Sequence, residues 1–214
     1  MQWLIPLLIL GLSVTSTLAK PATVLVLGDS LSAGYGLKRS AAYPALLLKK
    51  ANAAGVALTV VNASVSGDTT AGGLQRLPAL LHQHMDVLVL ELGINDAFRG
   101  VPVAQIATNL QAIIDLTKKR YPKVRIVIAG MQLPEASGED YLAAFGRLYL
   151  DLAKRNDAAL IPFLLRGVAG DPSLNQNDLL HPNADGQKIL AATVWPFVRS
   201  AVTQASSLSS RAGF

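Results

Sequence analysis

The chain has 214 residues, of which 51% are hydrophobic and 15% charged, and its formal net charge is +5. This composition is typical of one folded domain with a sizeable core and excludes an intrinsically disordered chain. The sequence contains no cysteine, which excludes disulfides, cysteine-ligated zinc and a cysteine nucleophile.

The first 19 residues predict a signal peptide. Residues 4–12 are predominantly apolar, a run much shorter than the roughly 20 residues needed to span a bilayer. Small and polar residues follow and end at Ala19, before Lys20, which is typical of a secretory cleavage site. The segment before the apolar run has no Lys or Arg, so a buried N-terminal helix is the alternative. A cleaved leader would make the mature protein periplasmic or secreted, without a membrane span.

Beyond Lys20, short apolar runs alternate with longer helical patterns. Strands are predicted over residues 23–27, 57–61, 86–91, 124–129 and 159–163. Helices are predicted over residues 42–54, 70–84, 103–120, 139–156 and 183–203, and we expect Pro196 to kink the last of them. This alternation favours an α/β fold with a parallel sheet covered on both faces. We expect one domain over residues 20–204 and a disordered tail, rich in Ser and Gly, over residues 205–214.

Polar motifs follow three successive predicted strands. Gly28-Asp29-Ser30-Leu31 follows the first strand, Ser66-Gly67-Asp68 the second, and Gly93-Ile94-Asn95-Asp96 the third. In an open parallel sheet, ligands bind beyond the carboxyl ends of the strands. We therefore expect the three motifs to converge at one edge of the sheet.

Each of these motifs contributes a residue suited to acyl transfer. Ser30 is a candidate nucleophile, although a serine that caps the next helix is a common alternative. The Gly67 backbone N–H and the Asn95 side-chain amide are candidate donors to a developing oxyanion. Taken singly, Gly67 could instead form a tight turn and Asn95 an Asx turn. A purely structural explanation is plausible for each of these residues singly, but less so for all three together.

The candidate base is His181, one of three histidines. His82 and His84 lie at the end of a predicted helix and lack a third ligand for a metal ion. Asp178 precedes His181 by three residues, a spacing at which two side chains in a turn can meet. A carboxylate there can hold the Nδ1 proton and leave Nε2 to face a serine. The alternative is a structural histidine at the start of the last helix.

These motifs resemble the SGNH (GDSL) hydrolase superfamily. Three extended stretches carry the resemblance, residues 28–36, 62–70 and 178–183, and it runs from Thr23 to about Val202. Within the superfamily the chain is most similar to the bacterial periplasmic acyl thioesterase/lysophospholipase/arylesterase group. The resemblance implies a three-layer α/β/α sandwich with a parallel, flavodoxin-like sheet, and neither cofactor nor metal.

The resemblance also implies the role of each candidate residue. Ser30 is implied as the nucleophile, His181 as the base and Asp178 as the acid that orients it. The oxyanion hole is implied to consist of the Ser30 and Gly67 backbone N–H groups and the Asn95 amide. The expected activity is hydrolysis of acyl esters or acyl thioesters through an acyl-enzyme on Ser30.

The third motif departs from the pattern of close relatives. Ile94 stands where they often have a second glycine, and Ala97 and Phe98 replace a smaller or less aromatic pair. Because this loop borders the acyl site in relatives, the departures bear on substrate range.

Other interpretations fit the sequence less well. A carbohydrate acetylesterase of the same superfamily is the alternative enzyme. A Rossmann-type nucleotide site fails because Arg39 occupies the third glycine position after Gly34 and Gly36. An inactive binding module would not need the whole set of candidate residues. We expect a small-molecule or lipid acyl substrate and no nucleic acid, since no Lys/Arg run is interleaved with aromatics. The sequence leaves the oligomeric state open.

Overall fold

A five-stranded parallel sheet forms the centre of the computed structural model, which describes residues 20–134 and 138–210. The strands lie in the order β2-β1-β3-β4-β5, and every pairing is parallel. Their bounds are β1 Ala22–Gly28, β2 Leu58–Asn62, β3 Val87–Glu91, β4 Arg125–Ala129 and β5 Ala159–Ile161. All five predicted strands are therefore present, with ends that differ from the prediction by at most two residues.

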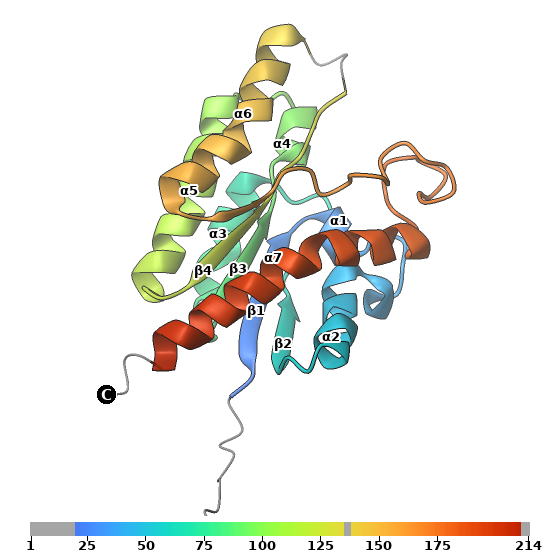
Figure 1. Cartoon of the computed structure of the whole chain (residues 1–214). Helices are drawn as coiled ribbons and strands as arrows, with labels where there is room; N and C mark the ends of the chain where they lie inside the picture. The colour runs from blue at the N-terminus through green and yellow to red at the C-terminus, as the bar shows by residue number, and fades with distance from the viewer. Residues whose placement is uncertain (1–19, 135–137, 211–214) are drawn as a thin grey trace, which may run out of the picture.

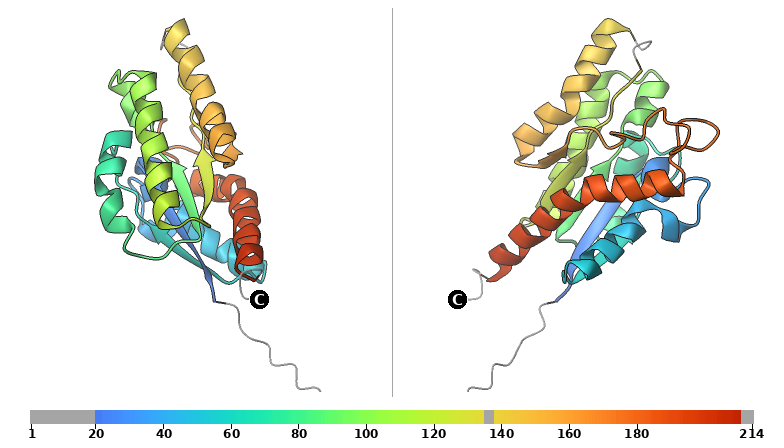
Figure 2. Two further views of the ribbon diagram at one scale, coloured as in Figure 1. Left: turned by 90° about the vertical axis from the view of Figure 1, so that its left-hand side faces the viewer. Right: turned by 45° about the vertical axis from the view of Figure 1, so that its right-hand side comes forward.

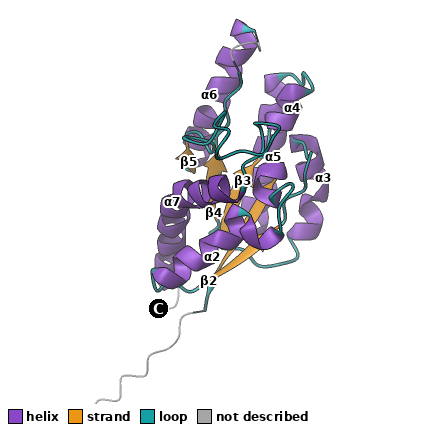
Figure 3. Cartoon of the chain, turned by 90° about the vertical axis from the view of Figure 1, so that its right-hand side faces the viewer, coloured by secondary structure: helices purple, strands orange, loops and turns teal. Residues whose placement is uncertain are grey.

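Helices cover both faces of this sheet (Figure 1). Helices α2 and α7 pack together on one face, while α3, α5 and α6 form the other layer, as Figures 2 and 3 show. The helical segments are α1 Ser30–Ala33, the 3₁₀ helix η1 Arg39–Ala41, α2 Tyr43–Ala53, α3 Thr70–Leu80, α4 Ile94–Phe98, α5 Val103–Arg120, α6 Glu139–Asn156 and α7 Ala184–Ser210. The predicted three-layer α/β/α sandwich is confirmed.

The core lies along the two central strands. Residues 24–27 of β1 and 87–90 of β3 are all at most 1% exposed. A parallel strand covered by helices on both faces has no solvent side, so its sequence is a continuous apolar run rather than an alternating one. The sheet therefore holds the carboxyl ends of β1 and β3 in a fixed place, and these ends carry two of the three polar motifs.

The C-terminal part of the chain differs from the prediction. Helix α7 continues to Ser210, so the predicted disorder is wrong for residues 205–210, while residues 211–214 lie outside the described residues. Ala205 is only 6% exposed and packs against the rest of the protein. Extending an existing helix costs far less than nucleating one, so Ser-rich sequence does not end it. The helix also runs through Pro196 as one element.

Helix α3 ends at Leu80, four residues before its predicted end. The chain must turn here because the backbone N–H of Asp86 already donates to the Thr23 carbonyl of β1, at 2.8 Å. The predicted signal peptide lies outside the described residues. None of the helices within residues 20–134 and 138–210 has both the length and the apolar character needed to cross a membrane.

Candidate active site

The carboxyl edge of the sheet gathers the three polar motifs, as their positions in the sequence predict. Ser30 begins α1 directly after β1, and Asn95 lies in α4 after β3. The loop after β2 that carries Gly67 is joined to the end of β1, because the Val65 N–H donates to the Gly28 carbonyl at 3.0 Å. His181 comes from the loop before α7 and reaches the same edge.

Ser30, His181 and Asp178 form a hydrogen-bonded chain. The Nε2 atom of His181 lies 3.0 Å from Ser30 Oγ, and its Nδ1 atom lies 2.7 Å from Asp178 Oδ2. Asp178 Oδ1 accepts from the backbone N–H groups of His181 and Leu180 at 2.9 and 3.0 Å. These bonds, chiefly those from His181, lower the pKa of Asp178 to about 2. An ionised carboxylate thus fixes the ring so that Nε2 faces the serine hydroxyl.

The backbone conformation of Leu179 and the contacts of Tyr35 and Gln176 hold the loop that carries His181. Leu179 has a φ of 58°, a left-handed conformation that costs a residue with a side chain about 1–2 kcal/mol. It closes the turn that brings Asp178 back to His181. The Tyr35 ring packs against the imidazole with centroids 4.5 Å apart. Gln176 joins the two loops, since its N–H donates to the His181 carbonyl and its Nε2 to the Tyr35 carbonyl, at 2.8 and 2.7 Å.

The candidate oxyanion donors differ in their present partners. Gly67 has a φ of +78°, which glycine adopts without strain, and its carbonyl accepts from the Arg99 guanidinium at 3.0 Å. The Nδ2 atom of Asn95 donates both to Asp29 Oδ2 and to the Asp68 carbonyl, each at 3.0 Å. Both N–H bonds of Asn95 therefore have acceptors already. To serve an oxyanion, the amide must share or release one of them.

Asp29, which precedes the nucleophile candidate, is a site residue that the sequence did not reveal. Its Oδ1 accepts from the Leu31 N–H at 3.0 Å and so caps α1. Its Oδ2 holds the Asn95 amide. Burial raises the pKa of Asp29 to about 6, against the lowering effect of the Leu31 N–H. The residue thus connects the start of α1 to the third motif.

Arg76 of α3 was missed in the same way. Its Nε atom pairs with Asp68 Oδ2 at 2.7 Å, and its two terminal nitrogens donate to the carbonyls of Ala63 and Gly28. One side chain thereby ties the end of β1 to the loop after β2. Eight residues separate Arg76 from Asp68, and no local pattern marks them as partners.

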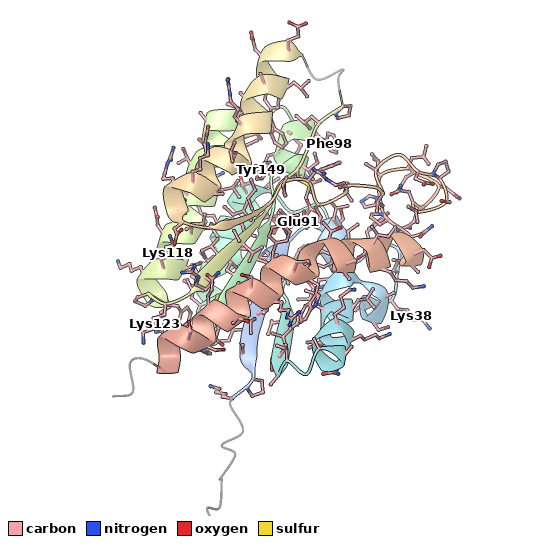
Figure 4. All side chains as sticks on the ribbon, in the orientation of Figure 1. Lys38, Glu91, Phe98, Lys118, Lys123 and Tyr149 are labelled. Carbon is pink, nitrogen blue, oxygen red and sulfur yellow. The ribbon has the colours of Figure 1, made fainter. Side chains whose placement is uncertain are left out.

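An apolar pocket of about 560 Å³ opens beside the candidate catalytic residues. Ser30, Asn95 and His181 share its lining with side chains such as Ile94, Phe98, Leu133, Phe163, Leu165 and Leu180. Phe98 is 57% exposed, at the position that Figure 4 labels. Two of the departures from the family pattern, Ile94 and Phe98, therefore border this pocket.

The described residues offer no arrangement for a metal ion. Within residues 20–134 and 138–210, no group of three or more His, Asp or Glu side chains could hold one. His84 instead lies 3.0 Å from the Asp86 carboxylate, before β3 and so at the opposite edge of the sheet.

Comparisons with known proteins agree with this geometry. The model of the GDSL-like lipase/acylhydrolase family matches residues 26–189. Esterase TesA of Pseudomonas aeruginosa is 42% identical over 191 residues, which cover 89% of this chain and 94% of that protein. The thioesterase 1/protease 1/lysophospholipase L1 of Escherichia coli K12 is 43% identical over 191 residues, 89% of each chain. The solved structure of the psychrotrophic esterase EstA from Pseudoalteromonas sp., inhibited by monoethylphosphonate, has a TM-score of 0.79 at 33% identity, covering 85% of this chain and 98% of that one. The chain therefore belongs to the GDSL-like lipase/acylhydrolase family, the SGNH hydrolases, and is an ester or thioester hydrolase.

Proposed function

We propose that this protein is an exported hydrolase of esters with aliphatic acyl chains, and that Ser30, His181 and Asp178 perform the reaction. The observation that carries the proposal is the continuous chain of contacts from Asp178 through His181 to Ser30 Oγ, at the side of an apolar pocket. The spacing of these atoms is that of a nucleophile, a general base and an acid that orients the base.

The reaction proceeds in two proton-coupled steps. His181 Nε2 takes the proton of Ser30 as Oγ attacks the carbonyl carbon, and the carbonyl oxygen becomes an oxyanion. The backbone N–H groups of Ser30 and Gly67 and the Asn95 amide donate to this oxyanion. As it collapses, the protonated His181 gives its proton to the departing alkoxide or thiolate, leaving an acyl ester on Ser30. Water, deprotonated by His181, then releases the carboxylic acid and restores the serine.

The pocket favours a substrate with an extended acyl group over an acetylated sugar. Burying one methylene group in apolar surroundings contributes about 0.8 kcal/mol, or roughly a fourfold gain in affinity. An acetyl group would leave most of the pocket's apolar lining unused. If residues 1–19 direct export, the accessible substrates are esters and lysolipids, because CoA thioesters are mainly cytoplasmic.

The proposal is tested with a panel of p-nitrophenyl esters of increasing chain length, acyl-CoAs, lysophospholipids and acetylated sugars. We expect kcat/KM to rise with chain length until the pocket is filled, and to be lowest for the acetylated sugars. Ser30→Ala should remove turnover and labelling by a fluorophosphonate. Unchanged turnover in Ser30→Ala would refute the assignment of the nucleophile, and a preference for acetylated sugars would refute the substrate class.

A further inference from the structure

Glu91, the last residue of β3, is completely buried beneath the candidate nucleophile. Figure 4 labels it in the interior of the protein, with Tyr149 above it. Carboxylates are almost never fully buried without a cation or several donors, because removing the charge from water is costly. Neither hydrogen-bond partner of Glu91 is a cation. Glu91 takes no direct part in the proposed acyl transfer.

The contacts of Glu91 lie on both sides of Ser30. Its Oε2 accepts from the Asp29 N–H at 3.1 Å and from Ser32 Oγ at 2.6 Å. Ser32 Oγ in turn lies 2.8 Å from the hydroxyl of Tyr43, which comes from α2. A Cβ atom on Gly28 would come within 2.5 Å of Glu91 Oε2 and within 2.7 Å of Ser32 Oγ, so the close approach favours glycine at that position. The glycine of the Gly-Asp-Ser motif thus makes room for Glu91 together with Ser32.

The second carboxyl oxygen, Oε1, is buried and has no hydrogen-bond partner among the described residues. A proton on Glu91 would remove the negative charge from this unpartnered oxygen and would give the carboxyl group a donor to direct toward the neighbouring Asp29. Burial raises the pKa of Glu91 well above its usual range, and the negative charge of Asp29 raises it further. Burial raises the pKa of Asp29 too, to about 6. A protonated Glu91 beside an ionised Asp29 leaves one negative charge, rather than two, in this buried space.

Other titratable groups face the pair from each neighbouring element. Tyr43 of α2 and Tyr149 of α6 are buried, and burial raises the pKa of each phenol. His181 faces Asp29 from the loop before α7, and Asp68 faces it from the loop after β2. Both phenols stay neutral, so they add no charge to compensate an ionised Glu91.

We propose that Glu91 is a positioning residue for catalysis: a protonated, buried carboxyl group that fixes the turn carrying Ser30 and, through Asp29, the amide of Asn95. The inference rests on the proposed acyl transfer at Ser30. Glu91 does not touch the substrate. It acts on the placement of the nucleophile and of one oxyanion donor, so its loss should lower kcat and leave KM nearly unchanged.

Three variants separate this role from simple structural support. Glu91→Gln keeps the shape, an acceptor for Asp29 N–H and Ser32, and a donor toward Asp29. Glu91→Leu replaces the carboxyl group with an apolar side chain and leaves the Asp29 N–H and the Ser32 hydroxyl without this acceptor. Asn156→Leu is the matched control, because Asn156 is a buried amide that bonds Gln111 and the Leu152 carbonyl on the α5–α6 layer.

Kinetics are measured with a p-nitrophenyl ester, and each preparation is titrated with a fluorophosphonate to count active sites. We expect Glu91→Gln to keep kcat within about threefold of wild type, and Glu91→Leu to lose at least about tenfold with KM within about twofold. Asn156→Leu should lose stability but keep kcat per titrated site. A folded Glu91→Gln variant as impaired as Glu91→Leu would show that the ionised carboxylate is required, and would overturn the proposal. Wild-type kcat in Glu91→Leu would overturn it as well.

An infrared difference spectrum between wild type and Glu91→Gln at pH 7 tests the proton itself. We expect the carbonyl band of a protonated carboxylic acid in wild type and its loss in the variant; absence of the band from wild type would overturn the inference even if Glu91→Leu did not fold. This measurement needs no substrate. Failure of wild type to react with esters and with the fluorophosphonate would instead count against the proposed function.

Discussion

The side-chain amide of Asn95 already has two acceptors, Asp29 and the Asp68 carbonyl, before it can serve a substrate. Such an amide is held in one orientation, which is the condition for effective stabilisation of a charge that exists only in the transition state. Its disadvantage is that one of the two N–H bonds must be shared between its present acceptor and the substrate oxygen. Through Asp29, the orientation of the Asn95 amide therefore depends on the turn that carries Ser30.

Replacement of Asn95 tests this donor. For Asn95→Ala we expect kcat to fall by about 10²–10³, equivalent to about 3–4 kcal/mol, with KM little changed. Asn95→Asp should be worse, because it places a negative charge where negative charge must form. The measurement is steady-state hydrolysis of a p-nitrophenyl ester, with circular dichroism as the control for folding. A folded Asn95→Ala variant with more than about a tenth of wild-type kcat would remove Asn95 from the site.

The buried Asp29–Glu91 pair also predicts a dependence of stability on pH. Both carboxyl groups have a pKa raised by burial, Asp29 to about 6 and Glu91 well above its usual range. Between the unfolded and folded pKa values, the folded protein binds more protons than the unfolded chain, so stability falls as pH rises. One such proton corresponds to a slope of up to about 1.4 kcal/mol per pH unit.

Glu91→Gln removes the contribution of Glu91 to this slope. We therefore expect the free energy of unfolding of the variant, relative to wild type, to increase as pH is raised from 4 toward 8. Urea unfolding at several pH values measures the difference. Curves that stay parallel over this range would mean that Glu91 keeps the same charge in the folded and unfolded states.

At the residue scale, sequence and structure agree where chemistry depends on local spacing. The spacing of Asp178 three residues before His181, and the position of Ser30 after a strand, predicted their contacts. The sequence could not reveal Glu91. It is 62 residues from Asp29, and a charged residue at the end of a predicted strand does not by itself indicate a buried site. Its partners exist only because β1 and β3 are neighbours in the sheet.

At the scale of elements, Arg76 shows how one helix positions two loops. Its contacts with Asp68, Ala63 and Gly28 join α3 to the ends of β1 and β2. For Arg76→Met we expect a loss of about 2–3 kcal/mol in the free energy of unfolding, because a partly buried carboxylate loses its charged partner. We expect kcat to fall as well, since the loop that carries Gly67 loses its support.

Arg76→Lys should be intermediate, because lysine keeps the pair with Asp68 but not the fork that reaches both carbonyls. Urea unfolding and ester hydrolysis provide the two measurements. Arg147→Met, at an exposed arginine of α6, is the control for loss of one positive charge. If Arg76→Met and Arg147→Met behaved alike in both assays, the loops would not depend on Arg76.

Long periodic elements could be predicted and short ones could not. Helices α5 and α6 begin and end where their apolar periodicity indicated. Helices α1 and α4 have four and five residues, too few to show a helical period, and both carry site residues. Helix α7 extends beyond its predicted end because Ala205 packs against the core, which the Ser-rich composition of this segment does not indicate. Tertiary contacts, rather than local sequence, decide these positions.

At the scale of the whole molecule, export remains a prediction that the N-terminal sequence alone supports. Protein expressed from the full sequence in a Gram-negative host should be recovered from the periplasm with an N-terminus at or near Lys20. N-terminal sequencing of the periplasmic and cytoplasmic fractions tests this. Intact chain that starts at Met1 and fractionates with cytoplasmic markers would contradict it.

The two ends of the described chain meet at the edge of the sheet opposite the site. Strand β1 begins there and α7 finishes there (Figure 1), and Lys20, Ala22 and Ala205 line one shallow pocket. A linker attached at either terminus, to a bead or to an electrode, would therefore hold the molecule with the apolar pocket beside Ser30 facing the surrounding solution. Immobilisation through a terminal tag should preserve turnover, whereas attachment through lysines on random faces would block a share of the molecules.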